Sequence, residues 1–136
     1  MREKRASDQK AAEAEALADE IFRTLPPLLR DAASGVAIRV VDFPDEETTA
    51  DFGLESPYEL LGLYRGVSLD RKSTLDVPLD VDMVFLYLVP IEAYCAETGE
   101  AFAQVLRHVL IHEIGHHFGF SDADMAAIED SADDGG

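Results

Sequence analysis

The chain has 136 residues, 47% of them hydrophobic and 29% charged, which is the size and composition of one globular domain. Its formal net charge of −17 disfavours nucleic acid and membrane surfaces as partners, because both are negatively charged. The chain offers no apolar run near the roughly 20 residues of a transmembrane helix, no apolar signal-peptide core, and only one cysteine, Cys95. We therefore expect a single cytoplasmic domain over residues 1–136, with flexible termini at residues 1–10 and 130–136.

The first part of the chain predicts two helices and a strand. Apolar residues recur at the spacing of one helix face over residues 11–25, and the prolines that follow end this helix. A short turn of helix is expected over residues 28–33. Alternating β-branched residues over residues 36–43 are typical of a half-buried strand. The acidic segment 46–57 is interpreted as a surface loop.

Two further strands and a long helix are predicted in the rest of the chain. Residues 60–69 form an apolar segment interrupted by glycines, which predicts a strand with either a bulge or a close approach of another backbone, and an edge strand is one interpretation of it. After a charged loop over residues 70–82, the continuous apolar run 83–89 indicates a central strand. Thr98 is expected to cap a helix whose apolar stripe continues to residue 118.

This last helix carries the pattern His112-Glu113-x-x-His116. A helical residue turns by about 100°, so the two histidines lie about 40° apart and one turn along, where both can reach one cation. Glu113 lies beside them, near enough to deprotonate an attacking water without acting as a ligand. These residue types at this spacing predict a zinc hydrolase site with Glu113 as its general base.

Asp122 is the best candidate for the third ligand that a catalytic zinc needs. Gly119 can take the left-handed conformation that ends a helix, and the chain can then turn so that Asp122 points back at the metal. One zinc ion per chain, bound by His112, His116 and Asp122, is the resulting prediction. The remaining acidic residues after Asp122, Glu129 among them, are interpreted as a solvated, fraying end.

Other polar residues near the motif have open roles. His117 points about 100° away from His116 and is interpreted as a packing or surface residue. His108 lies one turn before His112 on the same face and either supports the site or is only a partly exposed histidine. Tyr64, Tyr87 and His108 are candidates by residue type alone for stabilising a developing oxyanion.

The pattern His112-Glu113-x-x-His116-x-x-Gly119-x-x-Asp122, together with the glycine-containing segment 60–67, resembles the bacterial mini-zincins. These are minimal metallopeptidase-like proteins once described as a domain of unknown function. The resemblance covers residues 17–129. It implies an α+β, minimal zincin-like fold, in which a small mixed β-sheet packs against an N-terminal helix and a C-terminal helix that carries the HExxH motif.

The resemblance also implies an edge strand that pairs with an extended peptide substrate, and both 60–69 and 83–89 are candidates for it. One departure concerns Met125, which follows Asp122 by three residues, whereas the methionine turn of metzincins lies well downstream. Because only 14 residues follow Asp122, we expect a shallow and open cleft.

We therefore expect a zinc-dependent metallopeptidase that hydrolyses a peptide or small protein substrate. The first alternative is a non-catalytic zinc-binding interaction module whose acidic surface binds a partner. The second is a metal-dependent endoribonuclease of the kind that uses His-x3-His-x5-His on a helix, which Glu113 and the acidic charge disfavour. The sequence determines neither the substrate, nor the oligomeric state, nor whether the site is active alone.

Overall fold

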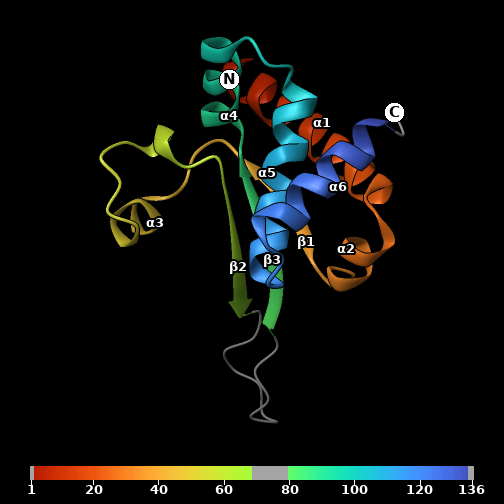
Figure 1. Ribbon diagram of the computed structural model, residues 1–136. Coiled ribbons are helices and arrows are strands. Elements are labelled where there is room, and N and C mark those ends of the chain that lie inside the picture. Colours follow the sequence, from red (N-terminus) through yellow and green to blue (C-terminus); the bar gives the residue numbers. More distant parts are fainter. Residues whose placement is uncertain (1, 69–79, 135–136) are drawn as a thin grey trace.

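The structure is a computed structural model that describes the chain over residues 2–68 and 80–134. Within these residues the helices outnumber the strands, and the strands form one small sheet (Figure 1). The elements in chain order are α1 (Arg2–Thr24), α2 (Pro27–Ala32), β1 (Ala37–Val41), α3 (Glu46–Asp51), the 3-10 helix η1 (Pro57–Glu59), β2 (Gly62–Ser68), β3 (Asp80–Tyr87), α4 (Leu88–Thr98), α5 (Phe102–His117) and α6 (Asp122–Asp134).

The sheet is mixed and has the strand order β1-β3-β2. β1 runs parallel to β3, with Ile38 opposite Val84 and Val40 opposite Leu86. β2 runs antiparallel to β3, with Gly62 opposite Leu86. The central strand predicted over residues 83–89 is thus confirmed as β3, except that residues 88–89 belong to α4, and the glycine-containing segment is confirmed as an edge strand, β2. Of the loop predicted over residues 70–82, residues 70–79 lie outside the described residues, and residues 80–82 belong to β3.

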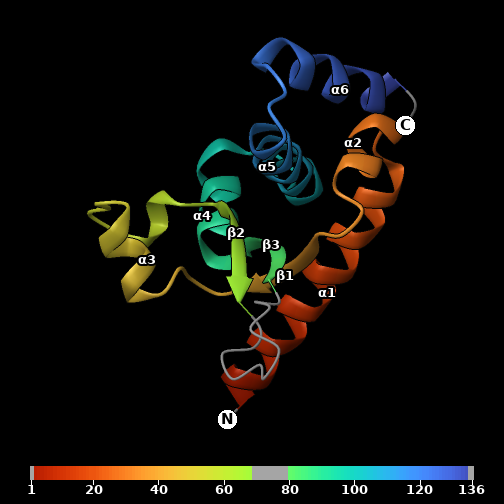
Figure 2. The same ribbon diagram turned by 90° about the horizontal axis from the view of Figure 1, so that it is seen from below.

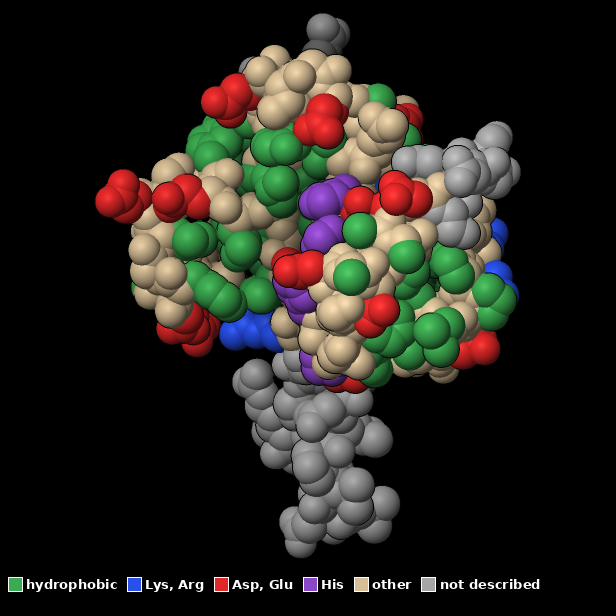
Figure 3. Space-filling view, viewed as in Figure 1, with side chains coloured by type: hydrophobic (Ala, Val, Ile, Leu, Met, Phe, Trp, Pro, Cys, Tyr) green, Lys and Arg blue, Asp and Glu red, His purple; other side chains and the backbone are tan. Residues whose placement is uncertain are grey.

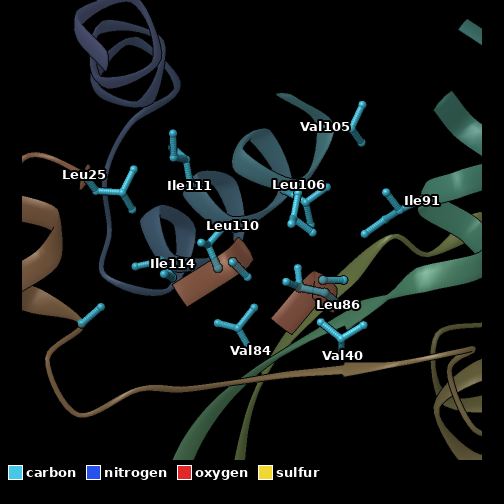
Figure 4. Close-up of a cluster of buried hydrophobic side chains, with 14 of the residues drawn as sticks. Leu25, Val40, Val84, Leu86, Ile91, Val105, Leu106, Leu110, Ile111 and Ile114 are labelled. Atoms are coloured by element: carbon cyan, nitrogen blue, oxygen red, sulfur yellow. The ribbon is translucent and has the colours of Figure 1, made fainter. Parts of the chain in front are cut away.

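Helices cover one face of the sheet. The residues of β1 and β3 that point to this face are buried, and they meet the apolar stripe of α5, in which Leu106, Leu110 and Ile114 are fully buried (Figure 4). α1 packs beside α5 and against β1. A small mixed sheet against an N-terminal helix and the motif helix is the α+β architecture that the sequence predicts, and it is confirmed.

The prediction of a loop over residues 46–57 was wrong, because this segment contains α3 and the start of η1. Asp45 caps α3, its carboxylate accepting a hydrogen bond of 2.7 Å from the backbone N–H of Thr48. Ser56 and Glu59 form a capping box at η1. Caps of this kind satisfy the free backbone N–H groups at a helix start, so short polar segments become helical without an apolar stripe.

Thr98 does not begin a helix but ends one. β3 runs directly into α4, whose last residue is Thr98 and whose C-cap is Gly99 with φ 78°. The hydroxyl of Thr98 donates to the backbone oxygen of Tyr94, 2.9 Å away, and so closes the last turn of α4. The apolar residues at the end of β3 continue into α4, where Leu88 and Ile91 are buried. The apolar pattern therefore gives no sign of the boundary between strand and helix.

Both chain ends are helical as far as the structure describes them, since α1 begins at Arg2 and α6 ends at Asp134. The flexibility expected of residues 1–10 and 130–136 stays a prediction. Among the described helices, none is long and apolar enough to cross a membrane.

Candidate active site

A histidine row runs along α5 and faces the following helix. His108, His112 and His116 stand at successive turns of α5, and in Figure 3 the histidine side chains form a row across the middle of one face with acidic side chains beside it. His108 and His112 have ring centroids 4.1 Å apart, and those of His112 and His116 lie 5.8 Å apart. The row is therefore continuous along two turns of the helix.

Gly119 turns the chain back along this row, as predicted. Its φ is 81°, and the turn has both hydrogen bonds of a Schellman motif: the N–H of Gly119 donates to His116 O at 3.2 Å, and that of Phe120 donates to Gly115 O at 2.8 Å. Ser121 then caps α6, because its hydroxyl accepts from the N–H of Asp124 at 3.0 Å. α6 consequently begins at Asp122 and returns over α5 (Figure 2).

Met125 holds α6 against α5. Its side chain is fully buried, and its sulfur lies 2.5 Å from where a Cβ on Gly115 would stand. Only glycine at position 115 allows this approach. Asp122 and Glu129 lie three residues before and four after Met125, so a helix places all three on the same face, opposite the histidine row.

The structure pairs each acidic side chain with a different part of the row. His116 Nε2 lies 3.4 Å from Asp122 Oδ1. His112 Nε2 lies 3.2 Å from Glu129 Oε1, and His108 Nδ1 lies 2.7 Å from the same oxygen. Of the three predicted ligands, His116 and Asp122 are thus brought together, whereas His112 faces Glu129. That His112, His116 and Asp122 bind one ion together stays a prediction.

Two of these pairs have the spacing of zinc ligands, whereas the His108–Glu129 pair, at 2.7 Å, is closer. Ligand atoms about 2.0–2.1 Å from zinc in a tetrahedron lie roughly 3.3–3.4 Å from one another, close to the distances of the pairs His116–Asp122 and His112–Glu129. Oε1 of Glu129 is fully buried and accepts no well-directed hydrogen bond from the described residues, although two imidazole nitrogens lie near it.

The pKa of His112 is lowered by burial first and then by the neighbouring His108, while the charge of Glu129 raises it. A lowered pKa favours the neutral imidazole, which is the form that binds a metal ion. The surroundings of His112 therefore favour the protonation state in which its imidazole can bind a metal ion.

Glu113 lies on the other side of α5 from Glu129, against β2. Burial raises the pKa of its carboxyl group, while a hydrogen bond with the backbone of Tyr64 and the nearby His116 lower it. Gly62 lets β2 come this close: a Cβ there would lie 2.5 Å from Val109 Cγ1 and 3.6 Å from Glu113 Cγ. The expected close approach at a glycine is confirmed, and it brings the edge strand to the carboxylate of the motif.

Residues 33–132 match the family model of the zincin-like metallopeptidases. The chain belongs to this family. A comparison with curated proteins found no match. Membership implies zinc binding and a hydrolase, and it confirms the resemblance to minimal zincins that the motif indicates.

In this zincin-like chain, Tyr64 and Tyr87, the two tyrosine candidates for stabilising an oxyanion, have different surroundings. The ring of Tyr64 stacks on that of His117, with centroids 3.7 Å apart, so His117 packs on β2 as well as being exposed. Burial and Asp82 raise the pKa of Tyr64 to about 12. Burial, with the charge of Asp45, raises that of Tyr87 to about 12. Both hydroxyls are therefore protonated donors at neutral pH, and neither is assigned to the oxyanion.

Glu129 is the site residue that sequence reasoning missed. It was interpreted as part of a solvated end, but its side chain is only 25% exposed and lies against two histidines. The interval of seven residues between Asp122 and Glu129 was the available signal, because residues seven apart share one helix face. The turn at Gly119 directs the face of α6 that carries Asp122 and Glu129 towards α5.

Proposed function

We propose that the protein is a zinc-dependent metallopeptidase that binds one zinc ion through His112, His116 and Asp122, with Glu113 as general base. The observation that supports this most directly is the position of Glu113. Its half-buried carboxylate lies near His116 on the motif helix and against the edge strand β2. This position supports a role for Glu113 as proton acceptor between the proposed metal ligands and a strand proposed to hold a peptide.

When bound, zinc supplies the Lewis acidity that activates water and polarises the peptide carbonyl. The residues of the chain supply the rest. Glu113 accepts the proton of the attacking water and passes it to the leaving amine, and its raised pKa brings proton affinity closer to neutral pH. His112 is kept neutral, and Asp122 contributes the hard oxygen donor.

The substrate is proposed to be a peptide or small protein segment in extended conformation. β2 pairs with β3 on one side, and no described strand pairs with its other side. β3 is central, with partners on both sides, so it cannot receive a further strand. Of the two segments that the sequence left open, β2 is therefore the one proposed to pair with substrate.

The test is hydrolysis of a diverse peptide library by the zinc-loaded protein and by Glu113→Gln. We expect the variant to keep its zinc and to lose hydrolysis by about 10²–10⁴-fold, the usual contribution of a general base. Glu97→Gln is the matched control, because Glu97 is exposed on α4. Equal rates in wild type and Glu113→Gln would contradict the proposal.

Wild type and Glu113→Gln, assayed with peptides and with RNA, separate the peptidase from the two alternative functions. Zinc binding with no Glu113-dependent cleavage of any peptide would favour a non-catalytic interaction module. RNA cleavage that persists in Glu113→Gln would favour the endoribonuclease, which the net charge of −17 disfavours.

A further inference from the structure

A second set of metal donors lies one turn along α5 from the proposed catalytic set. His108 Nδ1, His112 Nε2 and Glu129 Oε1 all lie within 4.8 Å of one another. Two imidazole nitrogens and a carboxylate oxygen are a common ligand set for zinc. Among the described residues this is the group whose three ligand atoms already converge, although the HExxH pattern makes no use of His108 or Glu129.

The backbone that carries Glu129 is held in place by two contacts. The guanidinium of Arg107 donates a hydrogen bond of 2.6 Å to the backbone oxygen of Glu129. Met125, one turn earlier in α6, is fully buried against Gly115. Glu129 Oε1 is buried and makes no directed hydrogen bond with the described residues, and His108 Nδ1 and His112 Nε2 lie 2.7 Å and 3.2 Å from it, so a cation bound by all three atoms would satisfy this oxygen.

An ion can reach these donors from solvent. A pocket of about 280 Å³ opens beside them, and His108, Glu129 and Arg107 are among its lining residues. A metal site needs such an entry path as well as its ligands.

The two sets share His112, and this creates a competition. An imidazole nitrogen has one lone pair, so Nε2 of His112 can bind one metal ion at a time. With His116 and Asp122 it belongs to the catalytic position, and with His108 and Glu129 it belongs to the other. In this structure Nε2 faces Glu129 at 3.2 Å.

Building on the proposed function, we propose that the seam between α5 and α6 has a second, alternative zinc position formed by His108, His112 and Glu129, which competes with the catalytic position for His112. The second position uses His108 and Glu129 in place of His116 and Asp122, so zinc bound there leaves the catalytic position without His112.

The experiment measures metal binding rather than activity. Zinc affinity is obtained by titration calorimetry of the metal-free full chain, and Co²⁺ substitution provides an absorption spectrum that reports the ligand set. The variants are His108→Ala, His112→Asn, Glu129→Gln, and the double variant His116→Asn with Asp122→Asn. His108 and Asp122 side chains are 57% and 92% exposed, so changes there leave the core intact.

We expect the double variant still to bind one zinc, while His112→Asn weakens binding by more than about 100-fold, because it removes the shared ligand. His108→Ala and Glu129→Gln should each change the Co²⁺ spectrum of the wild type. The spectrum of the double variant should lose its bands when His108→Ala is added. Peptide hydrolysis by Glu129→Gln should rise relative to wild type, because zinc is then confined to the catalytic position.

Two results would overturn the second position. One is a double variant that binds no zinc at concentrations that saturate the wild type. The other is an unchanged Co²⁺ spectrum and zinc affinity in His108→Ala, which would reduce the contact between His108 and Glu129 to an ion pair. Both leave the proposed peptidase intact. Conversely, absence of hydrolysis in every variant would refute the peptidase while the metal titrations still report on the second position.

Discussion

The carboxylate of Glu113 lies where the protein partly excludes water. Burial is the largest influence and raises its pKa above the ordinary value of 4.5. A group whose pKa is raised in the folded state adds stability below its unfolded pKa, and that stability is lost as the pH rises through the folded pKa. At pH 7 the ionised Glu113 therefore destabilises the metal-free fold. Such a cost is typical of residues placed for chemistry rather than for stability.

Glu113→Gln is accordingly expected to stabilise the metal-free protein at pH 7. The neutral amide has a similar shape without the partly buried charge, and a gain on the order of 1 kcal/mol would raise Tm by roughly 3–5 °C. The difference from wild type should shrink towards pH 4, where the wild-type carboxyl group becomes protonated. Thermal unfolding of both proteins with a chelator at pH 7 and pH 4 measures this. A larger advantage at pH 4 than at pH 7 would contradict it.

At the scale of elements, the site depends on two close approaches, each at a glycine of ordinary φ. Gly62 brings β2 onto α5, and Gly115 brings α6 onto it. A side chain at either position would separate an element from the motif helix, since the interior is packed too densely to absorb the added volume. The HExxH helix is thus positioned from both sides by residues that are not part of the chemistry.

Gly62→Ala is expected to destabilise the protein by about 1–3 kcal/mol, the usual cost of overpacking. Its Cβ would lie 2.5 Å from Val109 Cγ1, so the cost should fall in a Val109→Ala background, which removes that methyl group. Urea unfolding of the four proteins of this double-mutant cycle measures the coupling. Gly35→Ala is the control, because nothing lies within 4 Å of a Cβ there. Equal costs in both backgrounds would show that Val109 is not the obstacle.

At the scale of the whole molecule, α6 is attached to the fold partly through the site. Its contacts with α5 include Met125, the Arg107 hydrogen bond and the histidine–carboxylate pairs. Acidic side chains predominate on α6, in a chain of net charge −17. Zinc would link α5 to α6 and neutralise part of this charge, whichever of the two positions it occupies.

Zinc at 100 times its Kd should therefore stabilise the fold by about 2.7 kcal/mol and raise Tm by roughly 10 °C. A chelator should reverse the shift. Thermal scans with and without zinc measure it, and His112→Asn, which removes the ligand common to both positions, should abolish it. A shift retained in His112→Asn would place the stabilising ion elsewhere.

The features predicted from the sequence are those set by residues close to one another along the chain. The spacing of His112 and His116, the helix end at Gly119 and the apolar run of β3 follow from helical and strand periodicity. α3 and the start of α4 escaped prediction, because caps and a strand leading directly into a helix leave no change of apolar pattern. These misses did not affect the motif.

Only the tertiary structure decided what the motif helix meets. No periodicity shows that β2 is the edge strand beside Glu113, or that Glu129 folds back to His108 and His112 instead of ending in solvent. Those contacts join residues of different elements, and they depend on the glycines at which the backbones approach. The sequence by itself predicted the candidate ligands His112, His116 and Asp122, because they lie in one helix and at the end of the turn that follows it. The packing of α6 and β2 determined the surroundings of that chemistry, because packing is a property of the whole fold.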